Sequence, residues 1–315
     1  MVKKYYWFKI IIIICTVLFI GFGFLTLLLN LKPLYLGINY LFFSHNKSVK
    51  TIEKSGDFST IYDLVKLNDK TRADYIRSYI ETNGIKYISI PTSLGSENIF
   101  VYSSLQNDVR PILFVAHYDT FLDYKGALDN TGSVGVLLAA LKEVKNEISH
   151  GKVAFLFSTN EEDGLIGTRE FIKRHVKNRN LQFTAVINLD CVGRGKTIAV
   201  SSGTKAGLKL FIPLFGNILV SNKGVEHLNH YWKLDSLLTD LEAYGIGSEP
   251  DIISFSDTSS FLEKGIPAFH LTSDDMNSIV KYSHKDSDSI EILDEDSLKK
   301  IKDAIVQISK KNNLF

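Results

Sequence analysis

Short continuous apolar runs alternate along this chain with stretches in which apolar residues recur at helical spacing. Three of the runs, Ile112 to Val115, Val153 to Phe157 and Phe183 to Leu189, are rich in Val, Ile and Phe. Runs of this kind are typical of strands buried on both faces of a largely parallel sheet. Residues 131–145 carry an apolar stripe with the spacing of an amphipathic helix. The pattern predicts an α/β fold with a mixed, largely parallel central sheet flanked by helices.

The segment before these runs has local signals of its own. A helix is expected from Lys70 to about Thr82, with Asn68 or Asp69 as its N-cap. Strands are expected at residues 85–90 and 98–102. These elements extend the predicted domain upstream of the three apolar runs.

The N-terminal region carries the longest apolar run. Ile10 to Leu31 contains no charged residue, and at about 1.5 Å per helical residue it is long enough to cross a roughly 30 Å hydrocarbon layer. Lys3, Lys4 and Lys9 precede this run, whereas only Lys32 follows it closely, which keeps the N-terminus in the cytoplasm by the positive-inside rule. We therefore expect a single-pass cell-membrane protein whose folded domain lies on the extracytoplasmic side. A cleaved signal peptide is the alternative.

Four segments follow from this organisation. Residues 1–9 form a cytoplasmic N-terminus, 10–31 a transmembrane signal anchor, 32–58 an interfacial segment and stalk, and 59–315 the folded domain. The balance of 36 basic and 35 acidic side chains excludes the electrostatic footprint of a nucleic-acid-binding protein. The chain has two cysteines, one inside the apolar run, so no intrachain disulfide is expected.

Five segments each carry side chains that bind divalent metals well. These side chains are His117, Asp129, the pair Glu161 and Glu162, Asp190, and His284. Predicted strands lead directly into His117, Glu161 and Asp190, and ligand sites of open α/β sheets lie beyond the carboxyl ends of the strands. We therefore expect these side chains to meet at one edge of the sheet.

Each of these residues also has an ordinary structural explanation. Asp129 could cap the helix that follows it, the two glutamates could form a solvated acidic turn, and the two histidines could be a core residue and a surface residue. Asp190 is harder to explain in this way, because a carboxylate that ends an apolar run must be paired, solvated or bound to metal. Taken together, the segments favour a two-metal hydrolase.

The residue types suit a dinuclear centre. Two cations usually lie roughly 3.5 to 4 Å apart, and Asp129, at the predicted start of a helix, is the candidate bridge between them. The other ligands would be His117 with Asp190 on one metal and Glu162 with His284 on the other. Nitrogen and oxygen ligands without cysteine suit catalytic Zn²⁺, two per chain, with Co²⁺ or Mn²⁺ as substitutes. Because neighbouring side chains in extended backbone point in opposite directions, one glutamate can bind metal while the other acts as a base.

Six motifs follow one another in a fixed order, within the part of the chain from about residue 71 to the C-terminus. They are His-x-Asp after a strand, Gly-Ala-x-Asp-Asn before a helix, Glu-Glu-x-Gly-Leu-x-Gly-Thr at 161–168, Asn-Leu-Asp-x-Val-Gly-Arg at 188–194, Ser-Asp-x-x-x-Phe-x-x-x-Gly-Ile-Pro at 256–267, and His-x-x-x-Asp-x-Ile-Glu at 284–291. In order, spacing and strand context the chain resembles the co-catalytic dizinc aminopeptidases. That zinc exopeptidase superfamily also contains glutaminyl cyclases and transferrin-receptor-like ectodomains.

The resemblance implies a zinc-exopeptidase fold and a role for each candidate residue. It implies metal ligands at His117, Asp129, Glu162, Asp190 and His284, a general acid/base at Glu161, and supporting residues around the metals at Asp119, Asp257 and Tyr282. Asp119 falls where the family has a carboxylate that orients the first histidine. The chain departs from the family pattern at Thr258, where histidine is frequent, and at Ser283, where an aromatic residue is frequent. Tyr282 could substitute for that aromatic residue.

Three functions agree with these residues. The leading one is a membrane-anchored metallo-aminopeptidase that acts on peptides with a free N-terminus, so that residues 59–315 form a zinc peptidase catalytic domain. The second is a glutaminyl cyclase, which converts N-terminal glutamine to pyroglutamate; Ser283 disfavours it, because such cyclases have Trp before the last ligand. The third is a non-catalytic receptor-like ectodomain, which would tolerate lost ligands, although none is lost in this sequence.

Overall fold

In a computed structural model of the chain, strands from both halves of the described sequence form one mixed sheet. The structure describes residues 49–103, 110–177, 181–201, 208–212, 216–220, 237, 241, 243, 246–250 and 256–311. The predicted N-terminus and anchor, residues 1–9 and 10–31, lie outside these residues. Among the helices of the described residues, none combines the length and the apolar character that a bilayer span requires.

Eight strands of the described residues follow one another across the sheet in the order β1-β2-β4-β3-β5-β10-β6-β9. They are β1 (Ile88–Pro91), β2 (Glu97–Val101), β3 (Ile112–His117), β4 (Val153–Ser158), β5 (Ala185–Leu189), β6 (Thr197–Ser201), β9 (Gly247–Pro250) and β10 (Ala268–Ser273). The central neighbours β4, β3, β5 and β10 run parallel, as do β6 and β9, and the remaining pairs are antiparallel. A separate antiparallel pair consists of β7 (Leu208–Ile212) and β8 (Gly216–Val220). The predicted mixed sheet with a largely parallel centre is confirmed.

The three apolar runs form the middle of this sheet. Every residue of β3, β4 and β5 is buried, as expected for strands covered on both faces. In the register of the parallel pair β3-β4, His117 lies opposite Ser158. Because the strands are parallel, the segments that follow His117, Ser158 and Leu189 leave the sheet at the same edge.

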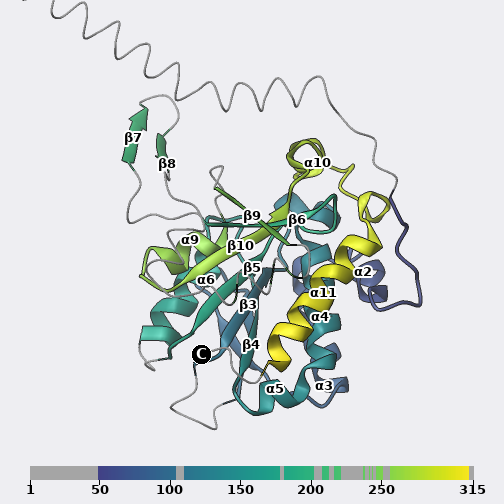
Figure 1. The fold of residues 1–315 in the computed structure, drawn as a ribbon, viewed down its shortest axis with the longest axis horizontal. Coiled ribbons are helices and arrows are strands. Elements are labelled where there is room, and N and C mark those ends of the chain that lie inside the picture. Colours follow the sequence, from purple (N-terminus) through teal and green to yellow (C-terminus); the bar gives the residue numbers. More distant parts are fainter. Residues whose placement is uncertain are drawn as a thin grey trace, which may run out of the picture. The chain divides into compact units, whose positions relative to one another are not determined.

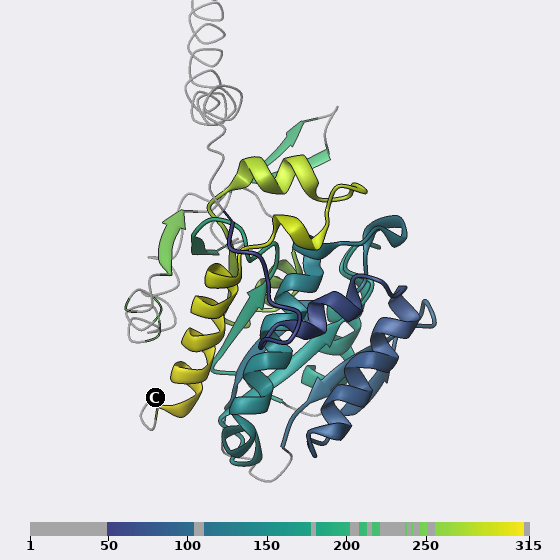
Figure 2. The same ribbon diagram turned by 90° about the vertical axis from the view of Figure 1, so that its right-hand side faces the viewer.

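Helices cover both faces of the sheet. They are α2 (Ser59–Leu64), α3 (Asp69–Thr82), α4 (Gly132–Glu143), α5 (Lys145–Ser149), α6 (Ile166–Phe171), α9 (Asp257–Leu262), α10 (Met276–Tyr282) and α11 (Glu295–Lys310). Helix α4 packs on β3 and β4 and is itself covered by α2, α3 and α11, whereas α9 packs on β3, β5 and β10 beside α6 (Figures 1 and 2). Single helical turns occur at Phe121–Asp123, Ala127–Thr131, Ile172–Lys177 and Ile290–Ile292.

The predicted helix after residue 68 is present as α3. The side chain of Asn68 caps it by accepting a hydrogen bond from the Thr71 amide at 3.0 Å. The helix ends at Thr82, two residues before Gly84, whose φ of +69° lies in the left-handed region that glycine adopts freely. Asp69, the other cap candidate, is the first residue of the helix. Its side chain accepts hydrogen bonds from Thr120 instead.

The predicted stalk requires a correction. Its described part, residues 49–58, packs on the folded domain, with Ile52 and Phe58 buried in the core at 3% and 2% exposure. The amide of Glu53 also donates to a carboxylate oxygen of Glu295 at the start of α11, at 2.8 Å. The folded domain therefore begins before residue 52 rather than at residue 59, because burial of these two apolar side chains outweighs the polar character of the residues around them.

Candidate metal centre

Four of the predicted metal-binding residues come from the three central strands or directly follow them. His117 is the last residue of β3, Asp190 comes directly after β5, and Glu161 and Glu162 follow β4 in a short turn. His117 and Asp190 are buried at 1% and 7% exposure. The Glu162 side chain is 11% exposed, which rules out the solvated acidic turn as an explanation of this segment.

Asp129 lies between two groups of candidate ligands. One carboxylate oxygen is 3.3 Å from His117 Nε2, and the other is 3.3 Å from His284 Nε2. His117 Nε2 also lies 3.8 Å from Asp190 Oδ1, and His284 Nε2 lies 3.1 Å from Glu162 Oε2. The side chain of Asp129 does not cap α4, whose N-cap is Thr131. Its two oxygens instead face one histidine each, as the predicted bridging position requires.

The donor atoms fit a divalent cation. The ligand atoms of His117, Asp129 and Asp190 lie within 4.8 Å of one another, and so do those of Asp129, Glu162 and His284. His117 Nε2 and Glu162 Oε1 are buried without a hydrogen-bond partner among the described residues. Buried polar atoms are rarely left unpaired, and imidazole nitrogen with carboxylate oxygen is a ligand set that zinc prefers. These residues therefore fit two zinc-type sites that share Asp129.

The pKa values reflect a concentration of buried carboxylates. Burial, with added repulsion from Asp190, Asp257 and Asp129, raises the pKa of Glu161 to about 10. Burial and the charge of Asp129 raise the pKa of Glu162 to about 7. Burial opposes ionisation of Asp129 as well, but hydrogen bonds from the two histidines outweigh it and lower the pKa of Asp129 below its usual value. Bound cations would stabilise the ionised form of every one of these groups.

Asp119 contacts two of the segments that carry candidate ligands. Its Oδ1 lies 3.6 Å from His117 Nδ1, and its backbone oxygen lies 3.2 Å from the same nitrogen. Its other carboxylate oxygen accepts a hydrogen bond from the Glu162 amide at 3.1 Å. An acceptor at Nδ1 leaves Nε2 free to bind metal. The backbone oxygen and the carboxylate of Asp119 therefore join His117 to the turn that carries the two glutamates.

Asp288 and Asn130 hold the segment around Asp129. The fully buried carboxylate of Asp288 accepts hydrogen bonds from the amides of Leu128 and Asp129, at 2.6 and 3.1 Å. The side chain of Asn130 donates to the Leu189 carbonyl at 2.9 Å and accepts from the Cys191 amide at 3.2 Å. The final Asn of Gly-Ala-x-Asp-Asn and the Asp four residues after His284 therefore fix the loop that presents Asp129.

Asp257, the first residue of α9, binds both ends of the segment that carries the two glutamates. Its carboxylate accepts hydrogen bonds from the hydroxyls of Ser158, at the end of β4, and Thr168, in α6, at 2.5 and 2.7 Å. Burial raises the pKa of Asp257 to about 6. A Cβ on Gly167 would lie 1.9 Å from the Thr159 carbonyl oxygen, so the glycine of this motif permits α6 to approach the turn closely. Asp257 and Gly167 together set the path of residues 158–168.

The sequence did not indicate the contacts of Tyr282, Phe121 and His270. Tyr282 packs against the hydrophobic core, and among the described residues it makes no hydrogen bond to a metal-binding side chain, so its proposed substitution for the missing aromatic residue has no support here. The ring of Phe121 stacks on His284 with 4.4 Å between centroids. His270 is buried on β10, with Nε2 3.1 Å from the Asp190 carbonyl oxygen. His270 lies in an apolar run of the sequence, and nothing in that pattern indicates its contact with a ligand segment.

Several solved structures share this fold. The Legionella pneumophila LapA aminopeptidase superposes with a TM-score of 0.61 at 15% identity, covering 82% of this chain and 70% of that protein. A Zn-dependent exopeptidase from Parabacteroides distasonis gives 0.58 at 16% identity, with 84% and 100% covered. A glutaminyl cyclase from Porphyromonas gingivalis gives 0.54 at 15% identity, with 82% and 97% covered. The predicted zinc-exopeptidase fold is confirmed, since likeness at this level of identity concerns the fold.

Two relatives match shorter stretches of sequence. The alkaline phosphatase isozyme conversion protein of Escherichia coli is 28% identical over 110 residues, which are 30% of this chain and 32% of that protein. The vacuolar membrane protease of Yarrowia lipolytica is 32% identical over 109 residues, which are 33% of this chain and 11% of that protein. The match therefore spans no more than about a third of the length of either relative.

Residues 98–309 match the sequence pattern of peptidase family M28. This stretch is more than half of the chain, and it contains all six motifs and the residues of the metal centre. The chain belongs to peptidase family M28, and with it to the zinc-dependent metallopeptidases that the six motifs predicted.

Proposed function

We propose that this protein is a membrane-anchored dizinc aminopeptidase that removes N-terminal residues from peptides. The observation that carries the proposal is the position of Asp129 between His117 and His284, with one carboxylate oxygen 3.3 Å from each imidazole. His117, Asp190 and Asp129 would hold one cation, and Glu162, His284 and Asp129 the other. The likeness of the fold to an aminopeptidase and to a Zn-dependent exopeptidase supports this assignment.

The protein's own residues have separate roles in hydrolysis. Two bound zinc ions would supply Lewis acidity, which activates water near neutral pH and stabilises negative charge on the peptide carbonyl oxygen. Glu161 takes the proton from the attacking water and returns it to the leaving amine. Asp119 keeps His117 in the tautomer that leaves Nε2 free. Asp257 holds the turn that carries Glu161, because it binds the residues on both sides of that turn.

A substrate panel tests this function. The full-length protein in detergent should contain two zinc ions per chain by mass spectrometry, and it should release the first residue from unblocked peptides but not from N-acetylated copies of them. Cleavage of the acetylated copies would contradict an aminopeptidase. Conversion of N-terminal glutamine to pyroglutamate with one zinc would favour the cyclase, whose fold is also similar. Protein with neither metal nor turnover would favour a receptor-like role.

The membrane anchor is part of the same proposal. Residues 10–31 form an uncharged apolar segment with three lysines before it and one shortly after, and one relative of this chain is named a vacuolar membrane protease. A reporter enzyme fused after Phe315 should be active only on the extracytoplasmic side. A C-terminus that is protected from added protease in intact cells would contradict this orientation.

A further inference from the structure

A buried arginine of α3 contacts the loop that joins the first metal ligand to the bridging carboxylate. Arg72 is 1% exposed. Its guanidinium donates to the carbonyl oxygens of Tyr118 and Lys125, at 3.3 and 2.7 Å, and to the Thr131 hydroxyl at 3.0 Å. Its Nε donates to the Leu67 carbonyl at 3.0 Å. One side chain therefore binds the beginning, middle and end of residues 118–131.

Asp69 binds the same loop from the preceding turn of the helix. Its Oδ1 accepts hydrogen bonds from both the amide and the hydroxyl of Thr120, each at 3.2 Å. Asp69 and Arg72 are three residues apart on a helix, so their side chains lie on one face. We call this pair the α3 clamp. Among the described residues, neither side chain forms a hydrogen bond or an ion pair with a predicted metal ligand.

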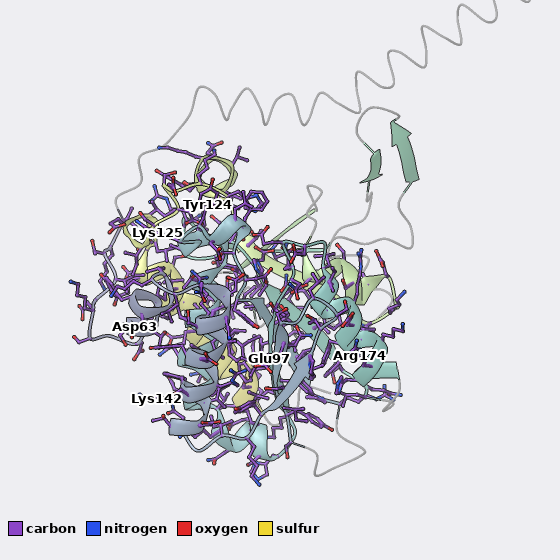
Figure 3. All side chains as sticks on the ribbon, turned by 180° about the vertical axis from the view of Figure 1, so that it is seen from behind. Asp63, Glu97, Tyr124, Lys125, Lys142 and Arg174 are labelled. Atoms are coloured by element: carbon purple, nitrogen blue, oxygen red, sulfur yellow. The ribbon has the colours of Figure 1, made fainter. Side chains whose placement is uncertain are left out.

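The loop needs such support because only the single helical turns at Phe121–Asp123 and Ala127–Thr131 give it regular hydrogen bonds. Leu122, Asp123 and Gly126 have φ values of 48°, 58° and 54°, in the left-handed region that is unfavourable for residues other than glycine. Buried carbonyl groups must also find donors, and Arg72 supplies them at Tyr118 and Lys125. Figure 3 shows Lys125, whose carbonyl group Arg72 binds, on the same side of the domain as Asp63 and Lys142 and above both.

We propose that the α3 clamp preorganises the metal centre: Asp69 and Arg72 hold residues 118–131 so that His117, Asp119 and Asp129 are positioned before a cation binds. The inference rests on the proposed function, because it assumes that these side chains bind zinc. Both clamp residues precede residues 98–309, the part that matches the family, so family membership assigns them no role. They are positioning residues, since they act through the loop.

Arginine is suited to this position by its shape and its charge. Burial lowers the pKa of Arg72 to about 10, with Asp69 and Asp119 opposing that shift, so the group stays charged at neutral pH. Its planar fork presents five donors in fixed directions, whereas a lysine ammonium is a single point on a flexible stem. Lysine could not reach three separated acceptors together. Arg72→Lys therefore keeps the charge and removes the multiple contact.

A comparison of two buried cations tests the clamp. Lys302 on α11 is 6% exposed and pairs with Asp57 and Glu143, at 2.9 and 2.7 Å. Lys302→Met should therefore destabilise the domain through contacts that do not involve the loop. Zinc affinity of the full chain in detergent is measured by competition with a chromogenic chelator, and thermal stability is measured on zinc-free protein. Arg72→Lys should bind zinc about 10- to 100-fold more weakly than the parent, the usual effect of losing a residue that supports metal ligands. Lys302→Met should lower the melting temperature while its zinc affinity stays that of the parent.

A second pair of variants covers the case in which Arg72→Lys does not fold. Asp69→Ala should also weaken zinc binding, whereas Asp74→Ala, at an exposed position of the same helix, should not. Parent-like zinc affinity in Asp69→Ala or in folded Arg72→Lys would overturn the clamp alone, and so would an equal loss of affinity in Lys302→Met. A parent protein that binds no zinc would overturn the proposed function together with the clamp.

Discussion

Replacing Glu161 by glutamine removes the proposed base while changing little else in the metal-free protein. Burial, with the charges of Asp190, Asp257 and Asp129, raises the pKa of Glu161 to about 10. The carboxyl group is therefore protonated and uncharged at pH 7 when no cation is bound. Glutamine has nearly the same shape and is also uncharged. We expect metal-free Glu161→Gln and the metal-free parent to have nearly the same free energy of unfolding at pH 7.

Bound cations change this comparison. To accept a proton near pH 7, Glu161 needs its pKa lowered by about three units, which corresponds to about 4 kcal/mol. A divalent charge roughly 5 Å away stabilises a carboxylate by about 7 kcal/mol at an effective dielectric constant of about 20. The electrostatic effect of one such ion is thus large enough. By linkage, zinc binding at pH 7 must displace a proton from Glu161, and glutamine has no proton to release.

The expected result has three measurable parts. Turnover of Glu161→Gln should fall by about two to four orders of magnitude, and its zinc content should equal that of the parent. Zinc binding should release about one proton fewer per chain than in the parent. Steady-state kinetics, metal analysis by mass spectrometry, and calorimetry in two buffers of different ionisation enthalpy measure these quantities.

Glu162→Gln is the matched control, because it changes the neighbouring carboxylate in the same way. Glu162 Oε2 lies 3.1 Å from His284 Nε2, so its replacement should weaken zinc binding as well as lower the rate, since an amide is a poorer, uncharged ligand. The roles are assigned the wrong way round if Glu161→Gln loses zinc and Glu162→Gln keeps both ions. An unchanged number of released protons in Glu161→Gln would refute the electrostatic argument.

Three further predictions follow from the centre and its supports. Removal of metal by a chelator should abolish hydrolysis, and zinc or cobalt should restore it; full activity of metal-free protein would contradict this. Because the folded pKa of Asp257 is raised from 3.8 to about 6, the folded state binds more protons than the unfolded chain between about pH 4 and 6. Metal-free parent should therefore lose stability relative to Asp257→Asn as pH rises through this window, and denaturant titrations that show the opposite slope would exclude it. Gly167→Ala, whose Cβ would lie 1.9 Å from the Thr159 carbonyl oxygen, should cost about 1–3 kcal/mol or more in stability. Gly56→Ala, whose Cβ would have no atom nearer than 3.4 Å, should cost less than about 1 kcal/mol. Equal melting temperatures for the two variants would contradict the geometry.

The convergence of the candidate metal ligands could be predicted from the sequence because each apolar run marks where a strand ends. The runs before His117 and Asp190 became β3 and β5, which are parallel neighbours, so their last residues had to lie close together. His284 had no strand before it and was predicted through the family resemblance. The structure places the five predicted ligands in two groups that share Asp129, and it also groups Glu161 with His117 and Glu162.

Contacts between a side chain and a distant backbone could not be predicted in the same way. Arg72 binds carbonyl groups 46 and 53 residues later in the chain, and any residue can supply a carbonyl, so no sequence pattern records the pairing. The stalk was misplaced for a similar reason. Ile52 and Phe58 are isolated apolar residues in a polar stretch, and only the surface of the rest of the domain makes their burial possible. Tyr282 was chosen by its position beside Ser283, but the turn of α10 directs it to the core.

The balance of charge between the carboxylates of the candidate centre and the proposed cations bears on the proposed substrate. The buried or partly buried carboxylates around it belong to Asp119, Asp129, Glu161, Glu162, Asp190, Asp257 and Asp288. Arg72, on α3, is a buried arginine that binds the adjacent loop. Unpaired charges of one sign are costly to bury, and burial together with this repulsion holds the pKa of Asp288 near 6. Two divalent cations would offset most of the negative charge and leave a residual excess. That excess would attract the cationic α-amino group of a peptide and repel a C-terminal carboxylate, which supports the proposed cleavage at the N-terminal end.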